Sequence, residues 1–138
     1  MSGGNDAGER ADYHVRMQAQ RRARESARAR LLVEEFVRTA VARGLATVEL
    51  TARPWSGSGR YPTGVVGWYL KRDHSIGIGT DASYYLLVVA PQRFGRWRGV
   101  TLTPSDPPLQ VGEGARDGES APLAEFLRLR LEAGNDFP

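Results

Sequence analysis

The 138-residue chain contains no cysteine, which excludes disulfide bonds, thiolate zinc sites, iron–sulfur clusters and cysteine nucleophiles. Histidine is scarce as well: His14 and His74 are the only two, and neither belongs to a metal-binding motif, so we expect no metal site. No apolar run approaches the roughly 18 residues of a membrane helix, and the polar N-terminus, MSGGNDAGER, lacks the apolar core of a secretory signal. These absences predict a cytoplasmic protein without a membrane-bound segment.

Lysine is almost absent too, because Lys71 is the only lysine beside 18 arginines. The charges are unevenly spread along the chain. Residues 10–30 hold seven arginines against two acids, and residues 53–103 hold seven basic residues against two acids. Residues 104–138, in contrast, hold three arginines against seven acids. Two basic regions followed by an acidic one indicate anionic partners or pairing between the ends of the chain.

Composition divides the N-terminal part of the chain into three segments. Residues 1–12 are rich in glycine and polar residues and predict a disordered tail. Residues 13–43 contain neither glycine nor proline before Gly44, which predicts a helix that ends at this glycine. Large apolar residues recur at 3–4 spacing only in its second half, around Val33 and Phe36. We therefore expect residues 13–30 to form a basic helical arm and residues 31–134 to form a single α+β domain.

Beyond Gly44 the apolar period changes from helical spacing to two, which is typical of strands. Segments 45–52, 64–71, 75–79 and 84–90 are predicted as strands, and segment 98–103 as a fifth. Because the turns between neighbouring segments are short, we expect an antiparallel meander. Segment 104–119 is predicted as a long loop, residues 120–134 as a helix and residues 135–138 as a tail. The predicted fold class is α+β, a two-layer sandwich with an N-terminal and a C-terminal helix on a four- or five-stranded antiparallel sheet.

None of the residue clusters supports catalysis. Asp73, His74 and Ser75 are neighbours in a predicted turn, and a catalytic triad needs groups that converge in space in distinct roles. The glycine- and serine-rich segment 56–60 lacks the lysine of a phosphate-binding loop and precedes a strand rather than a helix. We therefore predict a protein that is not an enzyme and has no cofactor.

Arginines alternate with aromatic residues in segment 93–98, RFGRWR. Such side chains can stack on nucleobases and pair with phosphates. Trp55 and Arg60, on either side of the glycine- and serine-rich segment, are further candidates. The alternative is a hairpin loop with solvated arginines. The candidate binding residues in the segment are Arg93, Arg96, Trp97 and Arg98.

The basic helical arm is the second candidate binding element. Arginines recur on one of its faces, and others flank that face, so the arm could lie along a phosphate backbone, dock an acidic protein or stand in solvent. Its candidate residues are Arg16, Arg21, Arg22, Arg24 and Arg28.

The face of the sheet that the helices leave uncovered is the third candidate. If Val66, Trp68 and Leu70 face the helices, then Tyr69 faces away from them, and it would lie on an open apolar surface of the kind that proteins use as interfaces. From these features we expect a small interaction module that docks a protein partner through its basic arm and open sheet face. The alternative is a nucleic-acid-binding protein that uses the arm and segment 93–98. The sequence leaves the oligomeric state open.

Overall fold

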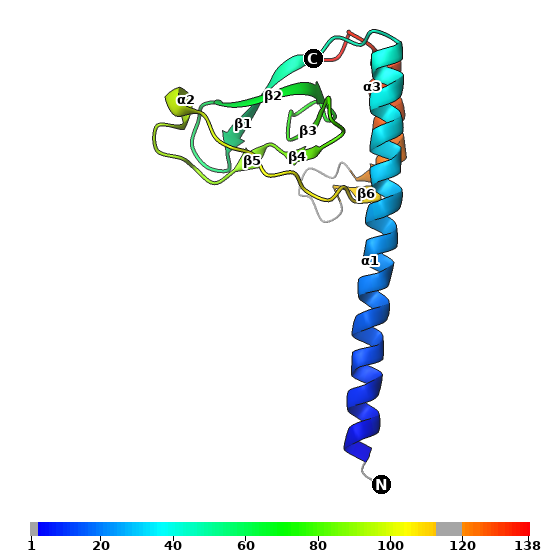
Figure 1. Ribbon diagram of the computed structural model, residues 1–138. Helices are drawn as coiled ribbons and strands as arrows, with labels where there is room; N and C mark the ends of the chain where they lie inside the picture. The colour runs from blue at the N-terminus through cyan, green and yellow to red at the C-terminus, as the bar shows by residue number, and fades with distance from the viewer. Residues whose placement is uncertain (1–2, 113–119) are drawn as a thin grey trace.

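A computed structural model describes residues 3–112 and 120–138 of the chain. Its longest element is helix α1 (Gly3–Ala42), whose C-terminal half packs beside helix α3 (Leu123–Ala133) and the sheet, while its N-terminal half projects away from them (Figure 1). None of the described helices is long and apolar enough to cross a membrane.

Helix α1 ends where the sequence predicts, at Gly44. This glycine has φ +68°, and its N–H donates to the carbonyl of Val41, while the N–H of Leu45 donates to the carbonyl of Ala40. This pair of bonds is the Schellman motif, which satisfies carbonyls that the last helical turn leaves without partners. The chain then reverses direction into the sheet.

The beginning of α1 differs from the prediction. The helix begins at Gly3 rather than near Tyr13, so the described part of the expected tail is helical and continuous with the arm. Once a helix is nucleated, each further residue adds one hydrogen bond at little extra cost, and Asp6 in the first turn suits the positive end of the helix dipole.

Five strands form the main sheet in the order β4-β3-β2-β1-β5. Neighbours pair antiparallel except for β1 and β5, which are parallel, so the sheet is mixed but mostly antiparallel. With the two long helices, it makes the fold α+β, as predicted. The strands are β1 (Val48–Pro54), β2 (Tyr61–Tyr69), β3 (Ile76–Gly79), β4 (Tyr84–Leu86) and β5 (Val88–Val89).

One predicted strand, residues 84–90, is divided at Leu87. The Leu87 N–H donates to the carbonyl of Ser75, beside β3, whereas the Leu87 carbonyl accepts from the N–H of Arg53 in β1. The N–H and the carbonyl of this one residue therefore bond to the β3 side and the β1 side of the sheet, which curls the sheet toward a small barrel.

The predicted fifth strand, residues 98–103, is not formed. Arg98 instead ends a short helix, α2 (Gly95–Arg98), and the strand at the β1 edge is β5. The chain leaves α2 through Gly99 at φ +73°, where an added Cβ would lie 2.6 Å from the carbonyl oxygen of Pro62. After this close approach the chain runs beside β2 but does not form the regular backbone hydrogen bonds of a paired strand.

Past the sheet, β6 (Gln110–Val111) pairs with β7 (Ala121–Pro122) immediately before α3. Part of the predicted 104–119 loop, residues 113–119, lies outside the described residues. The last residues, predicted as a tail, pack back onto the fold: Phe137 contacts a buried cluster, and the carbonyl of Pro138 lies 2.7 Å from His74 Nε2.

Two apolar clusters hold the fold together. The first lies between the helices and the sheet and includes Phe36, Trp68 and Leu127. The Phe36 and Trp68 rings meet edge to face with centroids 5.7 Å apart, and the Trp68 indole N–H donates to the carbonyl of Leu45. The second cluster lies inside the curl of the sheet and consists of Leu50, Tyr69, Tyr85 and Leu87.

Candidate functional site

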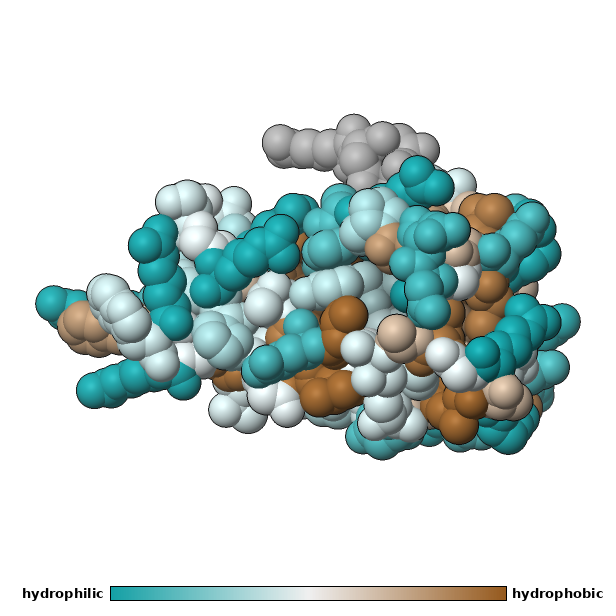
Figure 2. All heavy atoms as spheres, turned by 90° about the horizontal axis from the view of Figure 1, so that it is seen from above, coloured by the Kyte–Doolittle hydropathy of each residue, from teal (hydrophilic) through white to brown (hydrophobic). Residues whose placement is uncertain are grey.

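The structure brings together the candidates on segments 55–60 and 93–98. We call this set the aromatic–arginine surface: Trp55, Arg60, Arg93, Phe94, Arg96, Trp97 and Arg98. It lies at the end of the sheet that carries α2, and hydrophilic side chains project from that end of the molecule (Figures 1 and 2).

Helix α2 is fixed to strand β2 by its neighbours. The N–H of Gln92 donates to the hydroxyl of Tyr61, and the N–H of Val100 donates to the carbonyl of Pro62. Between them, Gly95 packs on the Tyr61 ring, where an added Cβ would lie 2.8 Å from ring carbons. A four-residue helix that could not persist alone is thus held in place by the strand.

The 55–60 loop joins this surface through Arg96. An added Cβ on Gly59 would lie 2.7 Å from Arg96 Nε, so the guanidinium group rests against the backbone of the loop. The N–H of Trp55 donates to the carbonyl of Val89, which anchors the start of the loop to β5. Arg60 is bound more loosely, with Nη1 3.3 Å from the hydroxyl of Thr51.

Three aromatic side chains on this surface are exposed to solvent: Trp97 is 78% exposed, Trp55 69% and Phe94 48%. Phe94 has the unusual φ of +64°, and Arg93 and Arg98 lie over its ring at 5.3 and 5.7 Å from the centroid. The Phe94 and Trp97 rings are 6.0 Å apart. Phe94 was missed as a site residue, although its position between arginines in RFGRWR was a usable signal.

The charged residues of the aromatic–arginine surface are all arginines, and the acidic residue beside them is Asp73, which lines the same hollow as Gly59 and Arg60. Segments 53–72 and 82–105 contain no aspartate or glutamate. Within the described chain, no carboxylate pairs with Arg93, Arg96 or Arg98. Unpaired guanidinium groups beside exposed rings can bind an anion that also has a stacking face.

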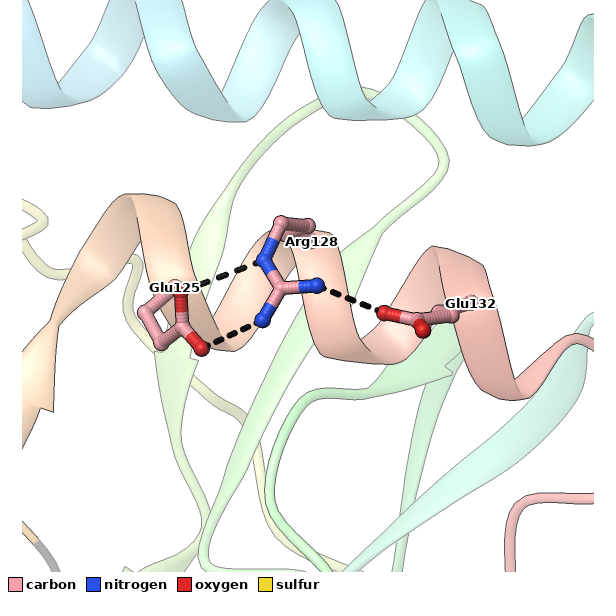
Figure 3. A network of polar contacts seen from close by, with 3 residues as sticks. All are labelled: Glu125, Arg128 and Glu132. Carbon is pink, nitrogen blue, oxygen red and sulfur yellow. Dashed lines mark hydrogen bonds and ion pairs between the residues drawn. The ribbon is translucent and has the colours of Figure 1, made fainter.

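Three acidic groups away from this surface are paired with arginines. Arg128 donates to Glu125 at 2.6 Å and to Glu132 at 2.7 Å on α3 (Figure 3). The hydrogen bond from Arg128 lowers the pKa of Glu125, and the same bond raises the pKa of Arg128. Asp106 pairs with Arg30 of α1 at 2.8 Å. These acids belong to the α1–α3 side of the fold.

The basic arm stands apart from the aromatic–arginine surface. Its arginines are exposed on α1, and α1 and α2 lie at opposite ends of the sheet (Figure 1). The two predicted halves of a nucleic-acid interface are therefore separate surfaces. The arm residues concerned are Arg16, Arg21, Arg22, Arg24 and Arg28.

At Tyr69 the predicted open sheet face is closed, although Leu86 and Val88 on β4 and β5 are exposed. Tyr69 is only 9% exposed, because the curled sheet encloses it in the second apolar cluster. Its hydroxyl accepts from the N–H of Thr51, and its ring stacks on His74 with centroids 3.8 Å apart. Val66, predicted to face the helices, is 47% exposed instead.

The Asp73–Ser75 segment forms the predicted turn. The N–H and hydroxyl of Ser75 both donate to Asp73 Oδ1, at 3.0 and 2.7 Å. Partial burial raises the pKa of Asp73, but the Ser75 hydrogen bonds and the charges of Lys71 and Arg53 outweigh it, so the pKa is lowered. No group of three histidine, aspartate or glutamate side chains that could hold a metal is found in residues 3–112 and 120–138.

Two buried cations, Lys71 and Arg130, were also missed by sequence reasoning. A signal was available for Arg130, which follows Leu123 by seven residues and Leu127 by three. It therefore continues the apolar stripe of α3.

Comparison with known proteins gives no match to this chain among protein-family models, curated proteins or solved structures. The function is therefore argued from the surfaces themselves.

Proposed function

We propose that the protein is a non-enzymatic binding module whose aromatic–arginine surface binds single-stranded nucleic acid. The observation that carries the proposal is the exposure of Trp55 and Trp97 beside arginines that lack carboxylate partners in the described chain. Bases of a single strand are free to stack on such rings, while guanidinium groups contact the phosphates. A duplex offers its phosphates but keeps its bases stacked on one another.

The arrangement of acidic groups supports nucleic acid over the protein-docking expectation. The acidic C-terminal region would repel a polyanion bound near it, but α3, which carries Glu125 and Glu132, packs beside α1, at the other end of the sheet from α2 (Figure 1). The Glu125 and Glu132 carboxylates are also paired with Arg128. In addition, Tyr69, around which an open sheet face for protein docking was predicted, is buried.

Trp97→Ala is the variant that tests the stacking contribution. Loss of one stacked base should weaken binding of a labelled oligothymidylate by about five- to a hundredfold, since base–aromatic stacking is worth about 1–3 kcal/mol. Fluorescence anisotropy at 50 and 200 mM salt measures this. The wild-type affinity should itself fall about tenfold or more over that range, because phosphate contacts release counterions.

Tyr13→Ala is the matched control, since Tyr13 is 55% exposed on α1, away from the proposed surface. It should leave the affinity unchanged. Equal affinity of wild type and Trp97→Ala, or the absence of binding at micromolar protein, would contradict the proposal.

A protein partner of the basic arm is a second candidate, supported by the N-terminal half of α1, which projects from the fold with exposed Tyr13 and Val15 (Figure 1). Deleting residues 1–24 should lower the thermal midpoint by no more than about 4 °C, because the deleted turns bury little apolar surface. A complex that survives nuclease and is lost on this deletion would favour protein docking. Loss of cooperative unfolding would instead mean that the arm belongs to the core.

A further inference from the structure

A second candidate site lies on the opposite side of the fold from α2, between α3 and the end of β2. It is a cavity of about 310 Å³, within the range of small-molecule sites, and its walls are mainly apolar. Leu70, Phe126, Leu129 and Phe137 supply these walls.

Arg130 is the polar feature of this cavity. It is 6% exposed, and its guanidinium group donates from Nε to the carbonyl of Tyr69 at 2.9 Å and from Nη1 to the carbonyl of Gly134 at 2.7 Å. The Phe137 ring lies against the same group, 4.3 Å from its central carbon. These contacts fix the position of the cation and leave Nη2 without a hydrogen bond to the described residues.

The charge of Arg130 is not neutralised by its partners. Both hydrogen-bond acceptors are backbone carbonyls, and no carboxylate of residues 3–112 or 120–138 pairs with it. Burial lowers the pKa of Arg130, as expected for a charge removed from water. A buried charge is costly unless an opposite charge or several hydrogen bonds compensate it, so the cavity favours an anion.

A second cation, Lys71, also lines the cavity and is only 4% exposed, but its charge has a carboxylate partner. Its Nζ lies 3.8 Å from Asp73 Oδ2. Arg130 is therefore the cation on which the preference of this cavity for an anion depends.

We propose that this cavity binds a small carboxylate with an apolar body. The carboxylate would accept from the free Nη2 of Arg130, and the apolar body would lie against Leu70, Phe126 and Leu129. A carboxylate with an apolar body suits the site, because the free edge of the Arg130 guanidinium group can donate to its oxygens while the mainly apolar walls contact its hydrocarbon part.

Isothermal titration calorimetry with octanoate tests the proposal on the intact protein. Octanoate should bind saturably with one site per chain. Octan-1-ol, of the same length but uncharged, should bind at least about tenfold more weakly, and acetate, charged but without a tail, should not bind at the same concentrations. The comparison of the three probes needs no variant and separates the contributions of charge and tail.

Leu129→Glu tests the location of the site. Leu129 is 47% exposed at the rim, so a glutamate is compatible with folding there, and its charge should weaken octanoate binding about tenfold or more. Arg130→Met should remove the preference for octanoate over octan-1-ol. Arg128→Met, on the exposed side of the same helix (Figure 3), and Trp97→Ala should both bind octanoate like wild type.

The proposal is overturned if octanoate does not bind saturably, if octan-1-ol binds equally well, or if Leu129→Glu binds like wild type. Loss of octanoate binding in Trp97→Ala would also overturn it, because that result would assign the ligand to the aromatic–arginine surface.

Discussion

Phe36→Ala is expected to lower the free energy of unfolding by about 3–5 kcal/mol, as large-to-small changes in a packed core do. Phe36 is 2% exposed and meets the Trp68 ring edge to face, at the contact between α1 and the sheet. The truncation removes this aromatic contact and leaves a cavity that α1 cannot close without shifting along the sheet. Urea denaturation followed by circular dichroism measures the effect.

Leu31→Ala is the control for Phe36→Ala on the same helix, because Leu31 is 63% exposed. It should change stability by no more than about 0.5 kcal/mol. A Phe36→Ala cost below about 1 kcal/mol would mean that α1 does not present this face to the sheet.

Reversing the charge of Arg93, Arg96 and Arg98 to glutamate should abolish oligonucleotide binding, lowering the affinity by about a hundredfold or more. All three are exposed and lack carboxylate partners in the described chain, so the fold should tolerate the change. Fluorescence anisotropy measures the affinity, and the thermal midpoint checks the fold.

The basic arm provides a control that excludes a simple effect of net charge. The variant with Arg21, Arg22, Arg24 and Arg28 changed to glutamate alters the net charge more than the triple variant does. Because the arm is separate from α2, this variant should nevertheless weaken binding by less than about tenfold (Figure 1). A larger loss of oligonucleotide affinity in the arm variant than in the triple variant would show that the arm, rather than α2, is the interface.

The helices and the first core were predictable from the sequence because their signals are local. The 3–4 spacing around Phe36 identifies the buried face of α1, and Gly44 identifies its end. Alternation likewise identifies Trp68 and Leu70 as residues that face the helices.

The curl of the sheet was not predictable in the same way. Residues 84–90 contain no glycine or proline at the bend, so their pattern is that of one continuous strand. The division at Leu87 depends on hydrogen bonds to Ser75 and Arg53, which are distant in sequence. Because this division curls the sheet, the burial of Tyr69 could not be deduced from alternation alone.

The candidate site was predictable in composition but not in arrangement. The residues of RFGRWR were identified from the sequence. The alternating pattern that begins at Arg98 is typical of a strand, however. In the structure, Gly95 and Gly99 pack against β2, and the residues from Gly95 to Arg98 form helix α2. The approach of Arg96 to Gly59, which joins the two segments, is a tertiary contact without a local signal.

The most direct test of the aromatic–arginine surface uses the indole N–H signals of the three tryptophans in an NMR titration with oligothymidylate. Trp55 and Trp97 are exposed on the proposed surface, whereas Trp68 is 1% exposed in the core and serves as an internal control. We predict that the Trp55 and Trp97 signals shift with a common saturation curve while the Trp68 signal stays in place. Saturable binding that leaves the Trp55 and Trp97 signals unmoved, or no binding at all, would contradict the account.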